Sequence, residues 1–248
     1  MEKVDYDARL HAVYAAGRQM APAAQRTWMD TFAGHLPTTR PLVWLDLGSG
    51  TGRMTPGLAE AFGGPVYGVE PSARMREQAV AHDAVTYLDG SGERIPLPDA
   101  SVDAALVFFV WHHVRDHAAA ARELLRVLRP GGRLFVQANF ADLMPDVWWF
   151  RVVPAWREVD RAQFGTFDEV CHDFTDAGFS LAARESVRWA RSGSLAEDVA
   201  KLRMRAVSAF ELMDASATAA GFAAIETALP TMEDGPQYET NSLLVFER

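Results

Sequence analysis

The chain has 248 residues, of which 49% are hydrophobic and 23% charged, a composition typical of a globular protein with one large domain. Its formal net charge of −9 argues against a nucleic-acid partner, because nucleic-acid-binding proteins usually carry a clustered basic face. The N-terminus lacks an apolar signal core and no stretch reaches the roughly 18 apolar residues that span a bilayer. We therefore expect a cytoplasmic protein without a membrane partner.

From residue 42 onward, apolar runs of strand length alternate with patterns typical of amphipathic helices. The expected strands are at 42–48, 66–70, 84–88, 102–110 and 133–139. The expected helices between them are at 53–62, 73–81 with Ser72 as its cap, and 117–128. A sixth strand after residue 179, two helical stretches and a last strand at 241–248 complete the chain. This alternation predicts a doubly wound, mostly parallel α/β sheet.

The segment "WLDLGSGTGRM" (44–54) places glycine at every second position after the first strand. The first strand-to-helix turn of an open α/β sheet is a common ligand site, because its backbone N–H groups and helix terminus face the ligand. A dinucleotide-binding turn requires G-x-G-x-x-G. Here the third glycine falls at Gly52 and Arg53 takes its place, a mismatch that counts against a nicotinamide or flavin cofactor.

The segment resembles motif I of the class I S-adenosylmethionine-dependent methyltransferases. Further stretches resemble the same family in the same order: "YAAGR" (14–18), "GSGERIPLPDASVD" (90–103), "WHHVRDHAAAARELLRVLRPGGRLFV" (111–136) and "AGF" (177–179). Glu70 stands 24 residues after Asp46, where the family places an acid on the ribose hydroxyls. The resemblance covers residues 10–140 well. It implies a Rossmann-like, seven-stranded sheet with an antiparallel last strand, and S-adenosylmethionine as cofactor.

We expect a single domain over residues 1–248 and divide it by its sequence patterns. Residues 1–40 would be an N-terminal helical segment, 41–139 the cofactor-binding core, and 140–175 and 190–235 a helical cap on the substrate side. The aromatic residues of the first cap segment, Trp148, Trp149, Phe150 and Trp156, are too many for a solvated loop. We expect some of them to pack the cap and others to line an acceptor site.

Each part of the cofactor has its own expected partners. Asp46 and the carbonyls near Phe108 and Phe109 would accept from the ammonium, Arg18 would pair with the carboxylate, and Glu70 with the ribose. Ser91 stands where the family often has an aspartate on the adenine, which leaves the adenine contacts open. The full set of expected cofactor-binding residues is Tyr14, Arg18, Asp46, Gly48, Ser49, Gly50, Glu70, Pro71, Ser91, Gly92, Glu93, Phe108 and Phe109.

Catalysis of methyl transfer needs mainly alignment and exclusion of water. A base is required where the acceptor must lose a proton, and His112 and His113 follow the fourth strand at the expected position. The structural alternative, in which the pair caps the following helix or orients the loop, is favoured slightly, since the pair resembles a block shared by enzymes with different substrates. No residues have metal-ligand spacing.

The sequence thus predicts a methyltransferase of a small, apolar or aromatic metabolite. Two alternatives remain open at this point: methylation of a protein or RNA, and a methyltransferase fold that performs non-methylating chemistry. Monomer and homodimer both remain open as well.

Overall fold

The structure is a computed structural model that describes residue 13 and residues 16–248. Its strands form one sheet in the order β3–β2–β1–β4–β5–β7–β6. They are β1 (Leu42–Leu47), β2 (Gly63–Val69), β3 (Val85–Leu88), β4 (Val102–Phe108), β5 (Leu128–Ala138), β6 (Ser180–Ser192) and β7 (Gln237–Glu247). β1 to β5 pair in parallel, whereas β7 runs antiparallel to both β5 and β6. The predicted Rossmann-like, seven-stranded sheet with an antiparallel last strand is confirmed.

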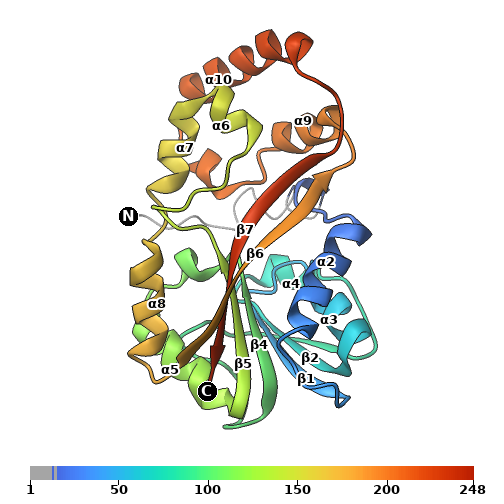
Figure 1. Cartoon of the computed structure of the whole chain (residues 1–248), viewed down its shortest axis with the longest axis vertical. Helices are drawn as coiled ribbons and strands as arrows, with labels where there is room; N and C mark the ends of the chain where they lie inside the picture. Colours follow the sequence, from blue (N-terminus) through green and yellow to red (C-terminus); the bar gives the residue numbers. More distant parts are fainter. Residues whose placement is uncertain (1–12, 14–15) are drawn as a thin grey trace.

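Helices cover both faces of the sheet and one of its ends (Figure 1). They are α2 (Pro22–Ala33), α3 (Thr55–Phe62), α4 (Ala73–Glu77), α5 (His117–Val127), α6 (Trp148–Val152), α7 (Pro154–Arg161), α8 (Phe167–Thr175), α9 (Leu195–Arg203) and α10 (Ala215–Ala228). Short 3₁₀ turns are η2 (Trp111–His113), η3 (Ser208–Glu211) and η4 (Leu229–Thr231). None of the helices in the described residues combines the length and apolar character needed to cross a bilayer.

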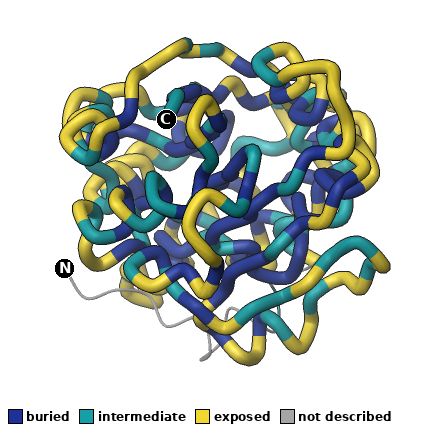
Figure 2. The backbone as a smooth tube through the Cα atoms, turned by 90° about the horizontal axis from the view of Figure 1, so that it is seen from below, coloured by how far each residue is buried: buried dark blue, intermediate teal, exposed yellow. Residues whose placement is uncertain are grey.

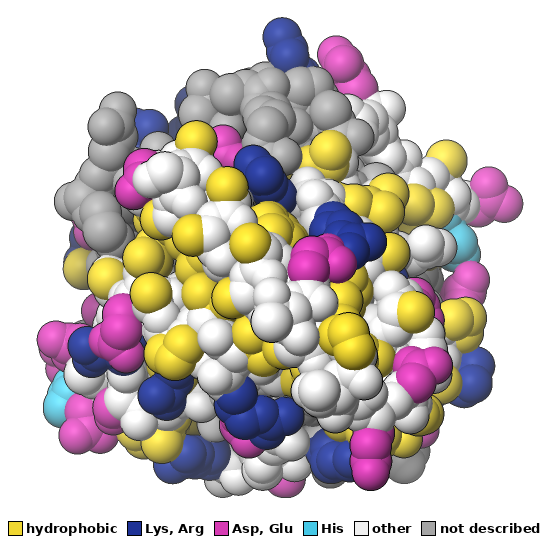
Figure 3. Space-filling view, turned by 90° about the horizontal axis from the view of Figure 1, so that it is seen from above, with side chains coloured by type: hydrophobic (Ala, Val, Ile, Leu, Met, Phe, Trp, Pro, Cys, Tyr) yellow, Lys and Arg dark blue, Asp and Glu magenta, His cyan; other side chains and the backbone are white. Residues whose placement is uncertain are grey.

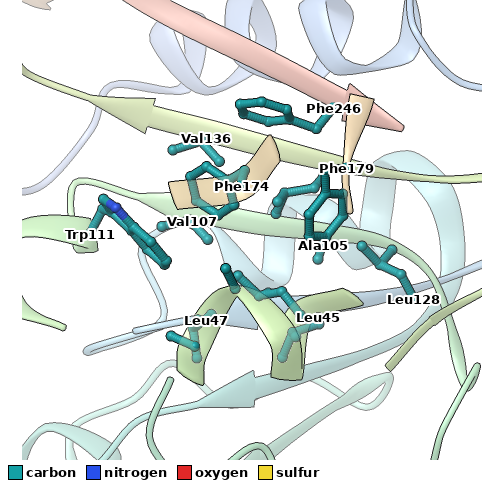
Figure 4. Packing of buried hydrophobic residues seen from close by; sticks show 14 of the residues in the cluster. Leu45, Leu47, Ala105, Val107, Trp111, Leu128, Val136, Phe174, Phe179 and Phe246 are labelled. Atoms are coloured by element: carbon teal, nitrogen blue, oxygen red, sulfur yellow. The ribbon is translucent and has the colours of Figure 1, made fainter. Parts of the chain in front are cut away.

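Two apolar clusters hold the helices on the sheet. On one face, α5 and α8 bury side chains such as Leu124 and Phe174 against the strands, and Phe174 packs with Phe179 and Phe246 (Figure 4). On the other face, α2 and α3 contribute the cluster members Trp28, Phe32, Leu58 and Phe62. Each such buried side chain stabilises the fold by about 1.5–3 kcal/mol. Figure 2 shows that the buried residues lie mainly in the centre of the molecule.

A cap stands beyond the carboxyl ends of β1 to β5, where the long strands β6 and β7 rise above their neighbours (Figure 1). Helices α6, α7, α9 and α10 form this cap, and a third cluster of buried side chains holds it together. Its buried members are Val147, Trp148, Trp149, Phe150, Trp156, Leu195, Val199, Leu202, Phe210 and Ile225. The cap therefore has an apolar core separate from the two cores beneath it.

Several element boundaries differ from the sequence-based expectations. β7 begins at Gln237, four residues before the expected start, because Gln237–Thr240 pair with β6 although their polar sequence carries no strand pattern. β5 already begins at Leu128, which pairs with Val102 before the Pro-Gly-Gly turn. The segment 140–175 also divides: α6 and α7 belong to the cap, whereas α8 packs on the sheet against α5.

Candidate active site

The turn between β1 and α3 contains three glycines in the left-handed region of backbone space. Gly48, Gly50 and Gly52 have φ angles of 71°, 56° and 81°, a conformation that costs other residues about 1–2 kcal/mol. A Cβ atom on Gly48 would lie 2.3 Å from Val110 Cγ2, and one on Gly52 would lie 2.2 Å from the Tyr87 hydroxyl. At Gly48 the protein itself, in addition to any ligand, excludes a side chain.

A backbone hydrogen bond joins this turn to β2, and another closes the turn itself. The Gly48 N–H donates to the Val69 carbonyl at 2.7 Å, and the Gly52 N–H donates to the Ser49 carbonyl at 2.9 Å. The Ser49 hydroxyl is buried and has no hydrogen-bond partner among the described residues. A buried polar atom in a native structure normally has a partner, so the turn offers an unused polar group beside the expected cofactor position.

Asp46 lies in β1 directly below the turn and is only 2% exposed. Its carboxylate accepts a hydrogen bond from the Thr55 hydroxyl at 2.7 Å. Burial raises the pKa of Asp46 to about 6, although the Thr55 hydrogen bond and the charge of Arg53 act in the opposite direction. A cationic group beside Asp46 would favour its ionised form. The ammonium of the cofactor is such a group.

Glu70 follows β2 and connects the glycine turn to the start of α4. Its Oε2 accepts from the Gly50 N–H at 3.1 Å and its Oε1 accepts from the Ser72 N–H at 2.9 Å. Ser72 in turn caps α4 by accepting from the Met75 N–H at 3.1 Å, as the sequence predicts, and Pro71 between them is exposed. Two of the hydrogen bonds that Glu70 accepts therefore tie the glycine turn to the start of α4.

The loop after β3 brings Ser91, Gly92 and Glu93 to the same edge of the sheet. Glu93 Oε1 accepts from the backbone N–H groups of Arg115 and Asp116, at 2.8 and 3.1 Å. Although burial acts to raise it, the pKa of Glu93 is lowered by these backbone hydrogen bonds and by one to Ser91. Glu93 therefore ties this loop to the segment before α5. A side chain on Gly92 would crowd Ala120, at 3.1 Å.

The end of β4 carries two aromatic residues with arginines over their rings. Phe109 has a φ of 58°, uncommon for a bulky residue, and its N–H donates to the Gln137 carbonyl at 2.9 Å. The Arg53 guanidinium lies 5.0 Å from the centre of the Phe108 ring, and that of Arg18 lies 5.4 Å from the Phe109 ring. Tyr14, expected beside Arg18, falls outside the described residues.

His112 and His113 are the last two residues of η2, which follows β4. Their ring centres are 3.9 Å apart, and His112 also makes an edge contact with Phe164, which lies between α7 and α8. The neighbouring Trp111 anchors the turn, because its indole N–H donates to Asp173 at 2.8 Å. Both histidines line a cavity between the sheet and the cap.

This cavity lies between the sheet and the cap, and residues of both line it. It joins the end of β4, the η2 turn and the cap, and Arg18 also reaches it. The cap contributes Trp149, Phe150 and Trp156 to its wall, whereas Trp148 serves the packing of the cap. The outer surface on this side mixes hydrophobic and charged side chains (Figure 3).

Charged residues that the sequence did not single out surround the apolar part of the cavity. Arg191 Nε lies 3.2 Å from Asp198 Oδ1, and its Nη1 lies 3.1 Å from Glu239 Oε2. The Arg191 guanidinium also lies 4.4 Å from the centre of the Trp149 ring. Asp160, a second carboxylate of the cavity wall, is 7% exposed. One signal could have indicated Asp160: it follows Trp156 by four residues, which places both on one face of α7.

Comparison with known proteins identifies the family to which this fold and its glycine turn belong. The family model described as "Methyltransferase domain" matches residues 45–136, the part that carries the turn, Glu70 and the histidine pair. A ubiquinone/menaquinone biosynthesis C-methyltransferase of Caulobacter is 30% identical over 181 residues, covering 63% of this chain and 71% of that protein. The chain belongs to the class I S-adenosylmethionine-dependent methyltransferases. S-adenosylmethionine is accordingly the cofactor, and no cluster of metal-binding side chains occurs within the described residues of this methyltransferase.

Two further relatives extend the comparison. An uncharacterized methyltransferase of Mycobacterium tuberculosis is 43% identical over 131 residues, which are 52% of this chain and 50% of that protein. The chain therefore aligns with about half the length of that relative. A solved structure from Anabaena variabilis, described as a methyltransferase of an antibiotic biosynthesis pathway, has a TM-score of 0.71 at 21% identity and covers 91% of this chain and 99% of its own. This likeness establishes the fold.

Proposed function

We propose that this methyltransferase transfers a methyl group from S-adenosylmethionine to a small metabolite with an apolar or aromatic body, by in-line displacement. The observation that carries the proposal is the shared cavity. Phe109 and His113, at the cofactor edge of the sheet, line the same space as Trp149 and Phe150 of the cap. An acceptor held against the cap aromatics would thus be next to the expected position of the methyl group.

The proposed cofactor site uses the residues around the glycine turn. Asp46 and the carbonyls near Phe108 and Phe109 would hold the ammonium, and Glu70 would hold the ribose hydroxyls. The remaining proposed contacts come from Arg18, Gly48, Ser49, Gly50, Pro71, Ser91, Gly92 and Glu93. The bound cofactor supplies a methyl group on a positively charged sulfur.

The protein has two tasks in such a reaction. It must align the acceptor with the methyl group, and alignment alone can contribute up to about 7–11 kcal/mol. It must also keep water away, which the buried aromatic residues of the cap support, Trp149 being 7% and Phe150 8% exposed. Both tasks are served by the cavity walls.

His113, with His112 beside it, is the proposed base for acceptors that must lose a proton. The pair lines the cavity. If His113 acts as base, His113→Ala abolishes turnover while the affinity for S-adenosylhomocysteine stays within a few-fold. His172→Ala, at an exposed position of α8, is the matched control. A His113→Ala variant that keeps most of its activity would assign the histidines a structural role.

Formation of S-adenosylhomocysteine tests the proposal directly. The protein is incubated with S-adenosylmethionine and a panel of small aromatic acceptors, and the product and the methylated acceptor are followed by mass spectrometry. The proposal predicts turnover with members of this panel. Product formed only with protein or RNA fractions would point to a macromolecular substrate. Binding of S-adenosylhomocysteine without turnover on any acceptor would point to non-methylating chemistry.

A further inference from the structure

Of three carboxylates in or beside the wall of the cap cavity, Asp198 and Glu239 have both oxygens engaged within the protein. Asp198 accepts from Arg191 at 3.2 Å through one oxygen and from the Trp148 indole N–H at 2.8 Å through the other. Glu239 accepts from Arg191 at 3.1 Å and from the Asn241 amide at 2.8 Å, again through separate oxygens. Arg191 is thereby shared between two buried acids, and neither acid has an oxygen without a donor.

Asp160, the third carboxylate, differs from these two. It lines the cavity and is 7% exposed, and its Oδ1 accepts one hydrogen bond, from the Gln163 amide at 3.1 Å. Gln163 is itself held by the Ser208 hydroxyl, which donates to its Oε1 at 3.1 Å. Within the described residues, Oδ2 of Asp160 receives no hydrogen bond. A buried carboxylate with a single neutral donor is poorly compensated.

The charges around Asp160 are unevenly engaged: Arg191 is shared by two acids, and Arg18 is the cation that acts on Asp160. The described wall of the cavity contains Arg18 and Arg191 against Asp160 and Glu239, and Asp198 stands behind Arg191; His112 and His113 are the other titratable groups of the wall. Burial raises the pKa of Asp160 to about 7, Arg18 opposes this rise and Glu239 adds to it. A cationic ligand group would supply the missing compensation.

We propose that Asp160 binds a protonated amine of the acceptor, while the acceptor's apolar ring lies against the cap aromatics. This assignment rests on the proposed function and narrows its substrate class to small aromatic molecules that carry an ammonium group. Trp156, one turn before Asp160 on α7, and Trp149 also line the cavity. Aromatic faces attract cations as well, so the wall around Asp160 suits an ammonium better than a hydroxyl or a carboxylate.

Three probes of similar size and different charge test this assignment. Phenethylamine, 2-phenylethanol and 3-phenylpropanoate are titrated calorimetrically at pH 8 into the protein, with and without saturating S-adenosylhomocysteine. The proposal predicts that the amine binds at least tenfold more tightly than the alcohol and that the carboxylate binds most weakly. Equal affinities for the three probes, a reversed order of affinity, or binding of none of the three would overturn the proposal.

Substitution of Asp160 provides a second test of the proposal. Asp160→Asn keeps the shape but removes the charge, so the preference for the amine over the alcohol should fall to a few-fold or less. Glu158→Gln removes a charge from an exposed position of the same helix and should leave the preference unchanged. An Asp160→Asn variant that keeps the tenfold preference would place the ammonium elsewhere.

The pH dependence of wild-type binding needs no variant. Because the amine stays protonated well above neutrality, its affinity should rise from pH 6 to pH 8 as Asp160 ionises, whereas that of the alcohol should change less. Equal pH dependence of the two probes would contradict the proposal. If S-adenosylhomocysteine itself fails to bind, the proposed function is contradicted, while the order of the three probes still decides the assignment of Asp160.

Discussion

The cofactor edge and the cap are built from contacts of very different range. At the cofactor edge, Gly50 and Glu70 are 20 residues apart and Asp46 and Thr55 are nine apart. In the cap, the hydrogen bond from Trp148 to Asp198 spans 50 residues and the one from Arg191 to Glu239 spans 48. The glycine turn and Glu70 thus lie within one strand–helix–strand unit, whereas these cap contacts exist only after distant segments have come together.

The two regions also differ in whether backbone or side chains shape them. The glycine turn acts through backbone conformation, and its side chains are small or absent. The cap acts through large side chains, and its aromatic residues belong both to the cavity wall and to a buried cluster. Substitutions in the turn should therefore affect the cofactor, and substitutions in the cap should affect the acceptor together with stability.

The largest expected effect is that of Trp149→Ala in the cap. Loss of a buried indole ring usually lowers the free energy of unfolding by about 3–5 kcal/mol, and Trp149 packs against both Trp148 and Phe150. The Michaelis constant for the acceptor should rise and the affinity for S-adenosylhomocysteine should stay unchanged. The milder Trp149→Phe keeps the protein folded for the kinetic comparison.

Trp148→Phe is the matched control, because it lies in the same helix and serves the packing of the cap. It should lower stability without changing the Michaelis constant for the acceptor. If Trp149→Phe weakened cofactor and acceptor binding equally, the proposed separation between the two regions would fail.

Gly48→Ala should lower the free energy of unfolding by about 2–3 kcal/mol, since it adds a left-handed backbone penalty to a contact with Val110. Chemical denaturation measures this change. Val110→Ala removes the opposing methyl groups, so the double variant should recover part of the loss relative to the sum of the two single variants. Strict additivity would mean that Val110 does not restrict position 48.

Glu70→Ala should weaken S-adenosylhomocysteine binding by about 1.5–3 kcal/mol, the range for hydrogen bonds to a charged group. Glu60→Ala, at an exposed position of α3, controls for the loss of one negative charge. Titration calorimetry compares the two. Unchanged affinity in Glu70→Ala would show that the ribose lies elsewhere.

A smaller effect is expected from pH at Asp46, whose pKa is raised to about 6. The ammonium of the ligand favours the ionised carboxylate, so affinity for S-adenosylhomocysteine should fall as pH drops below about 6, by up to about tenfold per pH unit. Asp46→Asn should bind more weakly at pH 8 and lose this dependence. An identical pH profile in both proteins would assign the dependence to another group.

The sequence separation of the contacting residues, short at the glycine turn and long in the cap, explains how much could be predicted from the sequence. The parallel sheet follows from strand patterns and the family from motifs such as the glycine turn, because these features are local, and the antiparallel last strand was expected from the family resemblance. Asp160, Arg191 and Glu239 escaped notice, since only tertiary packing brings them to one cavity. The early start of β7 was not predicted for the same reason, because its polar residues become a strand only through pairing with β6.

Titration calorimetry of the unmodified protein with S-adenosylhomocysteine and, separately, with NADH tests the central claim most directly. The claim is that the glycine turn and Glu70 hold S-adenosylmethionine and not a dinucleotide. It predicts saturable heat with S-adenosylhomocysteine and none with NADH. Saturable heat with NADH and none with S-adenosylhomocysteine would contradict the account of this site.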